Sequence, residues 1–290
     1  MKRVLLNSLG QVAGKYWYQE SPFTGVGFSI APDKYVLGFE INEGYIVGDY
    51  WPICAEKGTQ FMQIDLTGQL SDYVAPMHLG ERYTGVGYEF TGNKCDREVF
   101  LKNGLAHSEA HWDKNDVLRY FDAQRSGIGE AYEWHSNKNI ESIDISTSDK
   151  FSGSVSFSED KKIRRISAFL GFLESFPEIH ANARFFPFKS IEDLASCEAM
   201  EEVKLHGDGI NNNALSIFFE GKIFASLSDL ELHNVCTKDL ISDCFEPLKK
   251  LHVIRDKKSS EEVLFDLEFS RKCKKENPKL RVFFNFEEIF

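Results

Sequence analysis

The sequence lacks the features that mark membrane proteins and disulfide-rich secreted domains. No apolar run approaches the roughly 20 residues that a membrane-spanning helix needs. The apolar run after the basic start ends at Asn7, which is too short for a secretory signal. The six cysteines are scattered and form no C-x-x-C pair. We therefore expect reduced thiols, no disulfide framework and a cytoplasmic location.

Motifs of catalysis and cofactor binding are missing as well. The sequence has no P-loop, no H-E-x-x-H and no G-x-S-x-G, and the pairs Gly25-x-Gly27 and Gly85-x-Gly87 lack the third glycine of a dinucleotide site. His107 and His111 are four residues apart, which in a strand separates them by about 13 Å, too far for one ion. We expect no catalytic residue, no metal site and no cofactor, and an enzyme is the least favoured class.

Composition and charge describe a globular chain that repels polyanions. The 290 residues are 42% hydrophobic and include 25 phenylalanines, enough to build a large core. The net charge of −11 disfavours binding to nucleic acids and to anionic membranes. Such a surface attracts a basic protein, although the same charge is also explained by solubility alone.

Internal repetition runs from about residue 16 to residue 167. The segment Phe23-Thr24-Gly25-Val26-Gly27-Phe28 returns sixty residues later as Tyr83-Thr84-Gly85-Val86-Gly87-Tyr88. Aromatic anchors then follow at spacings of 22, 22 and 23 residues, at Phe90, Trp112, Trp134 and Phe157. A polar turn and an aliphatic residue follow the last three anchors, and period-two alternation flanks them. Each unit is therefore interpreted as strand, turn and strand.

This pattern resembles a known family. The repeats are similar to the MORN-variant repeats of bacterial antitoxin proteins. The resemblance consists of a Gly-x-Gly-aromatic motif, an acidic strand, an Asn-Gly pair, and then a tryptophan followed by asparagine. The resemblance is best over residues 83–167 and weaker over 16–75. Asn115-Asp116 and Asn137-Lys138 stand where the family commonly has Asn-Gly, and His107-Ser108 stands where His-Gly is usual. The resemblance implies an antitoxin, or immunity protein, that binds a toxin.

The character of the chain changes after Ser167. Residues 168–177 predict a short apolar helix ended by Pro177, and residues 178–193 predict a connection. From residue 194 the spacing L-x-x-L-x-L recurs, with central positions at Val203, Leu230, Leu251 and Leu280. This spacing resembles irregular leucine-rich repeats, with a return helix near residues 259–269.

The sequence thus predicts an α+β fold in which an antiparallel β-hairpin (MORN-like) repeat array is followed by a small leucine-rich-repeat-like solenoid. The expected domains are residues 1–167 for the array, 168–193 for the connecting helix and linker, and 194–290 for the solenoid. Both modules present broad surfaces, and solenoids commonly bind proteins on such surfaces.

Candidate partner-binding residues follow from alternation, because the residues beside the buried leucines point outward. In the solenoid they are Glu202, Lys204, His206, Asp229, Glu231, His233, Lys250, His252 and Arg281. In the hairpin array they are Glu109, His111, Glu133 and His135. Trp17 and Trp51 have weaker repeat context than the other tryptophans, so either is a further candidate for a partner contact.

The expected function is neutralisation of a cognate toxin by occlusion of its active site. The expected partner is a basic protein toxin encoded at the same locus, with no nucleic acid and no membrane. Two alternatives stay open: a protein-binding scaffold or adaptor that uses the leucine-rich face, and a carbohydrate- or lipid-surface binder that uses exposed aromatic residues.

Overall fold

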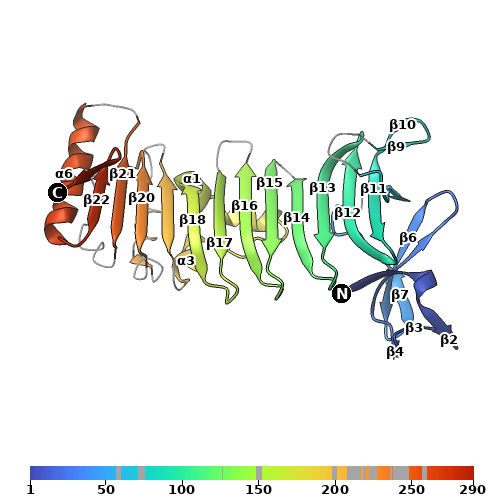
Figure 1. Cartoon of the computed structure of the whole chain (residues 1–290). Helices are drawn as coiled ribbons and strands as arrows, with labels where there is room; N and C mark the ends of the chain where they lie inside the picture. The colour runs from blue at the N-terminus through green and yellow to red at the C-terminus, as the bar shows by residue number, and fades with distance from the viewer. Residues whose placement is uncertain are drawn as a thin grey trace. The chain divides into compact units, whose positions relative to one another are not determined.

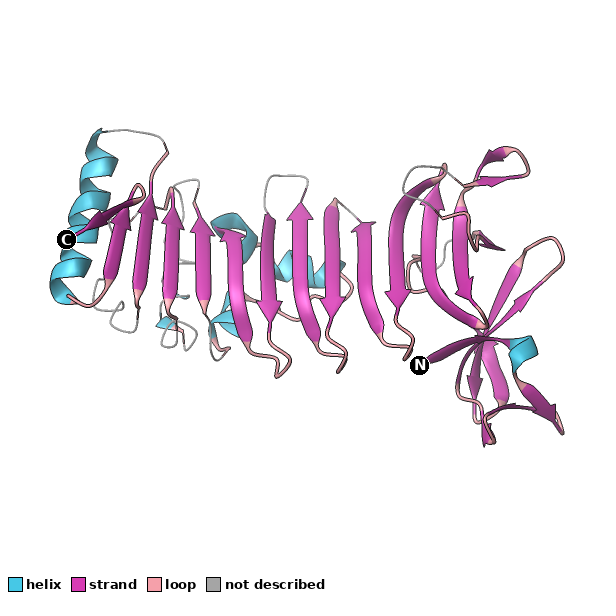
Figure 2. Cartoon of the chain, viewed as in Figure 1, coloured by secondary structure: helices cyan, strands magenta, loops and turns pink. Residues whose placement is uncertain are grey.

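The computed structural model describes residues 1–56, 60–70, 76–125, 127–147, 152–197, 201–207, 217, 220–221, 227–235, 237, 248–256 and 260–290. Strands are the main regular element of the described chain (Figure 2), and 18 of them belong to one mixed sheet. The chain divides into two compact units. The first comprises residues 1–124 and 133–138, and the second comprises residues 125–132 and 139–290.

The first unit is built almost entirely from strands (Figure 1). Its elements are β1 (Lys2–Leu5), the 3-10 turn η1 (Leu6–Ser8), β2 (Gly10–Val12), β3 (Lys15–Tyr18), β4 (Ser21–Pro22), β5 (Gly25–Ile30), β6 (Val36–Asn42), β7 (Tyr45–Asp49), β8 (Met62–Asp65), β9 (Met77–His78), β10 (Glu81–Arg82), β11 (Gly85–Thr91), β12 (Lys94–Lys102), β13 (Leu105–Trp112) and β14 (Leu118–Arg125). Strand β15 (Ile128–Trp134) contributes residues to both units.

The two copies of the sixty-residue repeat have the same local structure. β5 lies parallel to β1, with Gly25 opposite Lys2, and β11 lies parallel to β8, with Gly85 opposite Met62. A Cβ atom at Gly25 would lie 2.4 Å from the backbone oxygen of Lys2, and one at Gly85 would lie 2.5 Å from that of Met62. Glycine is therefore required where these strands meet.

A buried ion pair lies in the core of the first unit. The Arg3 guanidinium contacts the Glu98 carboxylate, and both side chains are at most 2% exposed. Arg3 also donates a hydrogen bond of 2.9 Å to the Tyr50 hydroxyl and lies 3.9 Å from the ring centroid of Trp112. Glu98 in turn accepts a hydrogen bond of 3.0 Å from the backbone N–H of Ile53. The pair thus ties together β1, β12 and the segment after β7.

The second unit adds helices to its strands. Its remaining elements are β16 (Ile140–Thr147), β17 (Ser152–Phe157), β18 (Ile163–Phe169), α1 (Leu170–Glu174), α2 (Phe176–Asn182), α3 (Ile191–Ala195), β19 (Glu202–His206), β20 (Asp229–His233), β21 (Lys250–Ile254), α6 (Ser260–Glu276), β22 (Arg281–Phe284) and β23 (Glu287–Ile289). β16, β17 and β18 pair antiparallel, whereas β18 to β22 pair parallel to one another.

An aromatic cluster joins the helices α1 and α2 to the segment that follows them. Phe172 and Phe176 are fully buried, and Phe186 and Phe188 are at most 5% exposed. Ring centroids lie 5.1 Å apart for Phe172 and Phe176, and 5.0 Å apart for Phe176 and Phe186. Pro177 lies in the first turn of α2 instead of ending a helix. Proline is tolerated there because the first N–H groups of a helix have no intrahelical partner.

The expected α+β fold, with a hairpin array and a separate small solenoid, is wrong. The chain is β-rich, and most of its described strands belong to one mixed sheet. β18 pairs parallel to β19 over five residues, with Arg165 opposite Glu202 and Ile166 opposite Val203. The backbone hydrogen bonds therefore continue from the antiparallel strands into the parallel ones. Pairing with β19 satisfies the backbone N–H and C=O groups along one edge of β18. Without β19 these groups would be available for pairing with another chain.

Candidate functional site

Nine of the expected partner-binding residues lie together on one face of the second unit. We call this face the charged band: Glu202, Lys204, His206, Asp229, Glu231, His233, Lys250, His252 and Arg281. The alternating residues of the same strands, such as Val203, Leu230 and Leu251, are at most 1% exposed. Burial of one face fixes the register of each strand, so the polar residues occupy the other face.

The parallel register aligns the charged band in rows across the strands. One row contains Arg165, Glu202, Asp229, Lys250 and Arg281, one from each of β18 to β22. A second row places Lys204 beside Glu231, followed by His252 and Phe283. A third row pairs His206 with His233. Opposite charges are neighbours at Arg165–Glu202, Asp229–Lys250 and Lys204–Glu231, whereas Glu202 lies beside Asp229 and Lys250 beside Arg281.

A polar groove of about 430 Å³ lies in the middle of the charged band. Its lining combines basic and acidic side chains with one histidine: Arg165, Glu201, Glu202, Lys204, Asp229, Leu230, Glu231, Lys250 and His252. Six of these residues were predicted from alternation. Arg165 was not, because β18 was assigned to another module. Glu201 was not, because it precedes β19 at a position that alternation groups with the buried residues Val203 and Leu205.

Ion pairs hold the charged side chains of the groove in place. The Lys204 ammonium lies 3.3 Å from a Glu202 oxygen and 3.7 Å from a Glu231 oxygen. Arg165 contacts Glu202 at 3.1 Å, and Lys250 contacts Asp229 at 3.4 Å. Partial burial alone would lower the pKa of Lys204, but the two carboxylates raise it above its ordinary value. Lys204 therefore stays charged at neutral pH.

Two histidines lie in contact at one edge of the charged band. The ring centroids of His206 and His233 are 5.1 Å apart, and His233 Nε2 lies 2.6 Å from the Asp256 carboxylate. Burial lowers the pKa of His206, and the neighbouring His233 lowers it further. Hydrogen bonds from His233 and Asn234 lower the pKa of Asp256. This edge thus combines a neutral imidazole with a histidine–carboxylate pair.

His252 lies flat against an aromatic ring on the next strand. Its ring centroid is 4.4 Å from that of Phe283, and the planes differ by 7°. Burial lowers the pKa of His252, and nearby Lys250 also lowers it, although Glu231 acts in the opposite direction. The neutral form of His252 is therefore favoured in the folded protein.

The histidines predict that acid destabilises the second unit. Because the folded-state pKa values of His206 and His252 lie below the unfolded value of about 6.5, the unfolded chain binds more protons once the pH falls below that value. Stability is therefore retained above pH 6.5 and lost as the pH falls toward the folded-state pKa values. The urea midpoint of this unit should be lower at pH 5.5 than at pH 7.5.

A variant without one imidazole tests this prediction. His206→Phe removes the titrating ring and should reduce the difference in urea midpoint between pH 7.5 and pH 5.5. His107→Phe, in the first unit, is the matched control and should retain the full difference for the second unit. An unchanged difference in His206→Phe would contradict the assignment.

The expected residues of the hairpin array form a second, smaller group in the first unit. The Glu109 carboxylate lies 2.6 Å from Arg97 Nη2 and 3.1 Å from His111 Nε2. Burial alone would raise the pKa of Glu109, but hydrogen bonds from His111 and Arg97 lower it to about 2. Burial and the Glu109 charge raise the pKa of Asp122, which lies opposite Glu109 on β14.

Glu133 and His135 lie at the end of β15 and just beyond it. Glu133 is exposed, and His135 is half-buried. Burial raises the pKa of Tyr120 to about 12, with smaller contributions from Asp122, Glu109 and Glu133. Glu133 therefore belongs to the electrostatic surroundings of the Glu109 group. The structure brings Glu109 and His111 into direct contact.

Two kinds of feature are absent from the described residues. Among them, no group of three or more histidine, cysteine or acidic side chains is arranged to hold a metal ion. No helix in the described part of the chain is long and apolar enough to cross a membrane.

Comparisons with known proteins give weak similarities. No protein-family model matches the sequence, and no curated protein matches it. The crystal structure of a GtfA/B complex bound to UDP and GlcNAc is 11% identical over 79% of this chain and 50% of the matched chain, with a TM-score of 0.21. The crystal structure of accessory secretory protein 1, 2 and 3 in Streptococcus pneumoniae is 10% identical over 67% of this chain and 38% of the matched chain, also with a TM-score of 0.21. This chain thus spans half or less of the matched chains, and these similarities assign no family.

Proposed function

We propose that this chain is an immunity protein that binds a basic protein toxin through the charged band and covers the toxin's active site. The observation that carries the proposal is the convergence of nine predicted residues on one face, with six of them lining one polar groove. The resemblance of residues 83–167 to MORN-variant antitoxins supports a toxin as the partner. The net charge of −11 supports a basic one.

The charged band offers three carboxylates to the basic residues of a partner, beside its own Lys204, Lys250 and Arg281. Glu202, Asp229 and Glu231 are held by lysines and arginines of their own face, so their carboxylates are already oriented. Lysines or arginines of a partner can share these oxygens, since a carboxylate accepts several hydrogen bonds. An interface of about 1,600 Å², as in stable complexes, would extend beyond the groove across β19 to β22.

A growth-rescue experiment tests the proposal. The chain is co-expressed with each toxin encoded beside its gene, and we expect one toxin to be neutralised. Glu231→Lys should abolish rescue, because it places a positive charge against a basic partner, and like charges in contact cost several kcal/mol. Asp160→Lys makes the same charge change on an exposed loop and should keep rescue, since the Asp160 side chain is 61% exposed.

Two outcomes contradict the proposal. Failure of every adjacent toxin to be neutralised would remove the immunity function. Full rescue by a folded Glu231→Lys variant would place the partner contact outside the charged band. Capture of several housekeeping proteins and no locus-encoded toxin would instead support the scaffold alternative.

A further inference from the structure

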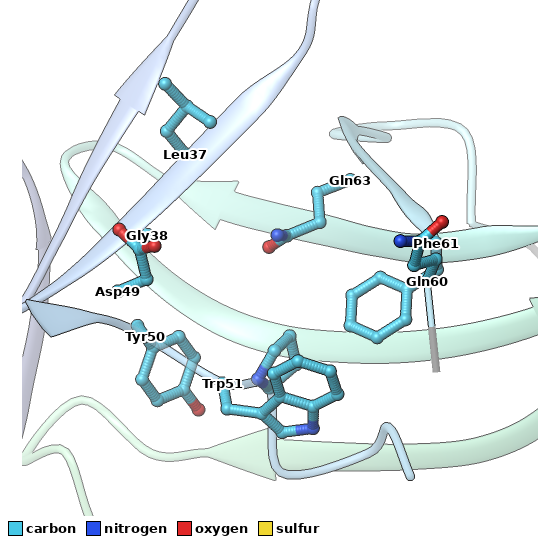
Figure 3. Close-up of a pocket in the computed structure, with 9 residues that line it drawn as sticks. Leu37, Gly38, Asp49, Tyr50, Trp51, Gln60, Phe61 and Gln63 are labelled. Atoms are coloured by element: carbon cyan, nitrogen blue, oxygen red, sulfur yellow. The ribbon is translucent and has the colours of Figure 1, made fainter. Parts of the chain in front are cut away.

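The first unit contains a second hollow that the charged band does not use. Its volume is about 610 Å³, within the roughly 300–1,000 Å³ typical of small-molecule sites. Figure 3 shows aromatic rings and amide side chains around it. Its lining residues are Leu37, Gly38, Asp49, Tyr50, Trp51, Pro52, Gln60, Phe61 and Gln63.

The buried Arg3–Glu98 ion pair positions residues 50–53, part of which lines this hollow. The Tyr50 hydroxyl accepts its hydrogen bond from Arg3, so the ring has a defined position. The Trp51 indole N–H lies 3.4 Å from the backbone oxygen of Ala55. Ile53, which lies between Trp51 and Ala55 in the sequence, donates its backbone N–H to Glu98. The segment that carries two of the aromatic rings is therefore ordered before any ligand binds, which lowers the entropy cost of binding.

Two aromatic side chains offer apolar surface to a ligand. Trp51 is 37% exposed, although its indole N–H is hydrogen-bonded to the Ala55 backbone oxygen. Its ring centroid lies 5.3 Å from that of Phe61, with the planes at 73°. Phe61 is supported from behind by Phe100 at 6.1 Å. A ligand with flat apolar C–H faces can pack against such rings.

Polar groups with free hydrogen-bonding capacity lie beside the rings. Gln63 accepts a hydrogen bond from the Tyr88 hydroxyl through Oε1, which leaves its two amide N–H donors for another partner. Among the described residues, Asp49 and Gln60 make no side-chain hydrogen bond or ion pair, and both are exposed. Amide donors and a carboxylate acceptor together match hydroxyl groups, which both donate and accept.

The charge of the described lining disfavours anionic ligands. Among the described lining residues, Asp49 is the one with an ionised side chain, and none is a lysine or an arginine. Phosphates and carboxylates would be repelled by the Asp49 charge. A neutral ligand with apolar faces and many hydroxyl groups satisfies both the rings and the polar side chains.

We propose that this hollow is a binding site for a neutral saccharide, stacked on Trp51 and hydrogen-bonded by Gln63 and Asp49. The site lies in the first unit and is independent of the toxin-binding proposal. The pyranose ring supplies the apolar C–H face for the indole, and its hydroxyls bond to the amide and the carboxylate.

Calorimetric titration of the whole chain with maltotriose, cellotriose and chitotriose tests the site. We expect at least one trisaccharide to bind, Trp51→Ala to weaken that binding at least tenfold, and Asp49→Ala to weaken it several-fold. Val47→Ala is the matched control and should change binding less than twofold, because Val47 is 62% exposed on the same strand as Asp49 and does not line the hollow.

Three results would overturn the proposal. They are the absence of binding by all three saccharides, unchanged binding in a folded Trp51→Ala variant, and competition for the hollow by a proline-rich peptide that binds more tightly than the saccharides. Circular dichroism of each variant establishes that it is folded, so a loss of binding is assigned to the site.

Discussion

Arg3→Met is expected to destabilise the first unit by about 3–5 kcal/mol, because it leaves the Glu98 carboxylate buried without its cation. Glu98 is fully buried, and Arg3 is 2% exposed. The substitution also removes the hydrogen bond to Tyr50 and the contact with the Trp112 ring. Urea unfolding followed by tryptophan fluorescence measures the change, since Trp112 lies directly against the guanidinium.

An exposed ion pair provides the control for this prediction. Arg164 and Glu201 are 3.3 Å apart with side chains more than half exposed, so Arg164→Met should cost less than about 1 kcal/mol. The double variant Arg3→Met with Glu98→Leu should recover part of the loss, because no charge then stays buried. A cost for Arg3→Met no larger than that for Arg164→Met would contradict the role assigned to the pair.

Phe176→Ala is expected to destabilise the second unit by about 3–5 kcal/mol through the cavity that it creates. Phe176 is fully buried, and its ring packs against Phe172, Phe186 and Phe188. Four aromatic rings in mutual contact cannot close around the lost volume without moving α1 and α2. Urea unfolding followed by far-ultraviolet circular dichroism measures the change.

Two other phenylalanine substitutions set the scale. Phe290 is fully exposed, so Phe290→Ala should change stability by less than about 0.5 kcal/mol. Phe176→Leu keeps most of the buried volume and should cost clearly less than Phe176→Ala. Equal midpoints for Phe176→Ala and Phe290→Ala would show that the aromatic cluster contributes little to stability.

Local patterns in the sequence were enough to place the charged band. Alternation in segments such as residues 202–206 has a period of two, so the outward residues follow directly once the segment forms a strand. The ion pairs between neighbouring strands depend instead on the parallel register, and the sequence of the long connecting segments does not reveal that register. The groove residue Arg165 was missed for this reason, since the pairing of β18 with β19 is a contact between distant segments. Glu201 was missed because it precedes β19 at a position that alternation groups with the buried residues.

The buried ion pair carries no local signal at all. Arg3 and Glu98 are 95 residues apart, and each is flanked by residues that suit an ordinary strand. The hollow beside Trp51 depends on the same long-range contacts, because Tyr50 is positioned by Arg3. Charged residues are usually solvated, so nothing in the sequence indicates that Arg3 is buried.

Turn chemistry shows a related limit of sequence patterns. Turns form at Asn115-Asp116 and Asn137-Lys138, where MORN-variant repeats commonly have Asn-Gly. The backbone φ is 59° at Asp116 and 72° at Lys138. Non-glycine residues are strained in this region, and the pairing of the flanking strands holds them there. The loss of glycine from a turn motif was therefore a poor guide to whether a turn is present.

Hydrogen exchange measured with and without the bound toxin tests the central claim most directly. The claim is that the charged band is the partner-binding surface. We expect slower amide exchange in β19, β20 and β21 on binding, with little change in β5, β6 and β7 of the first unit. Protection confined to the first unit, or unchanged exchange across β19 to β21 in a saturated complex, would contradict the claim.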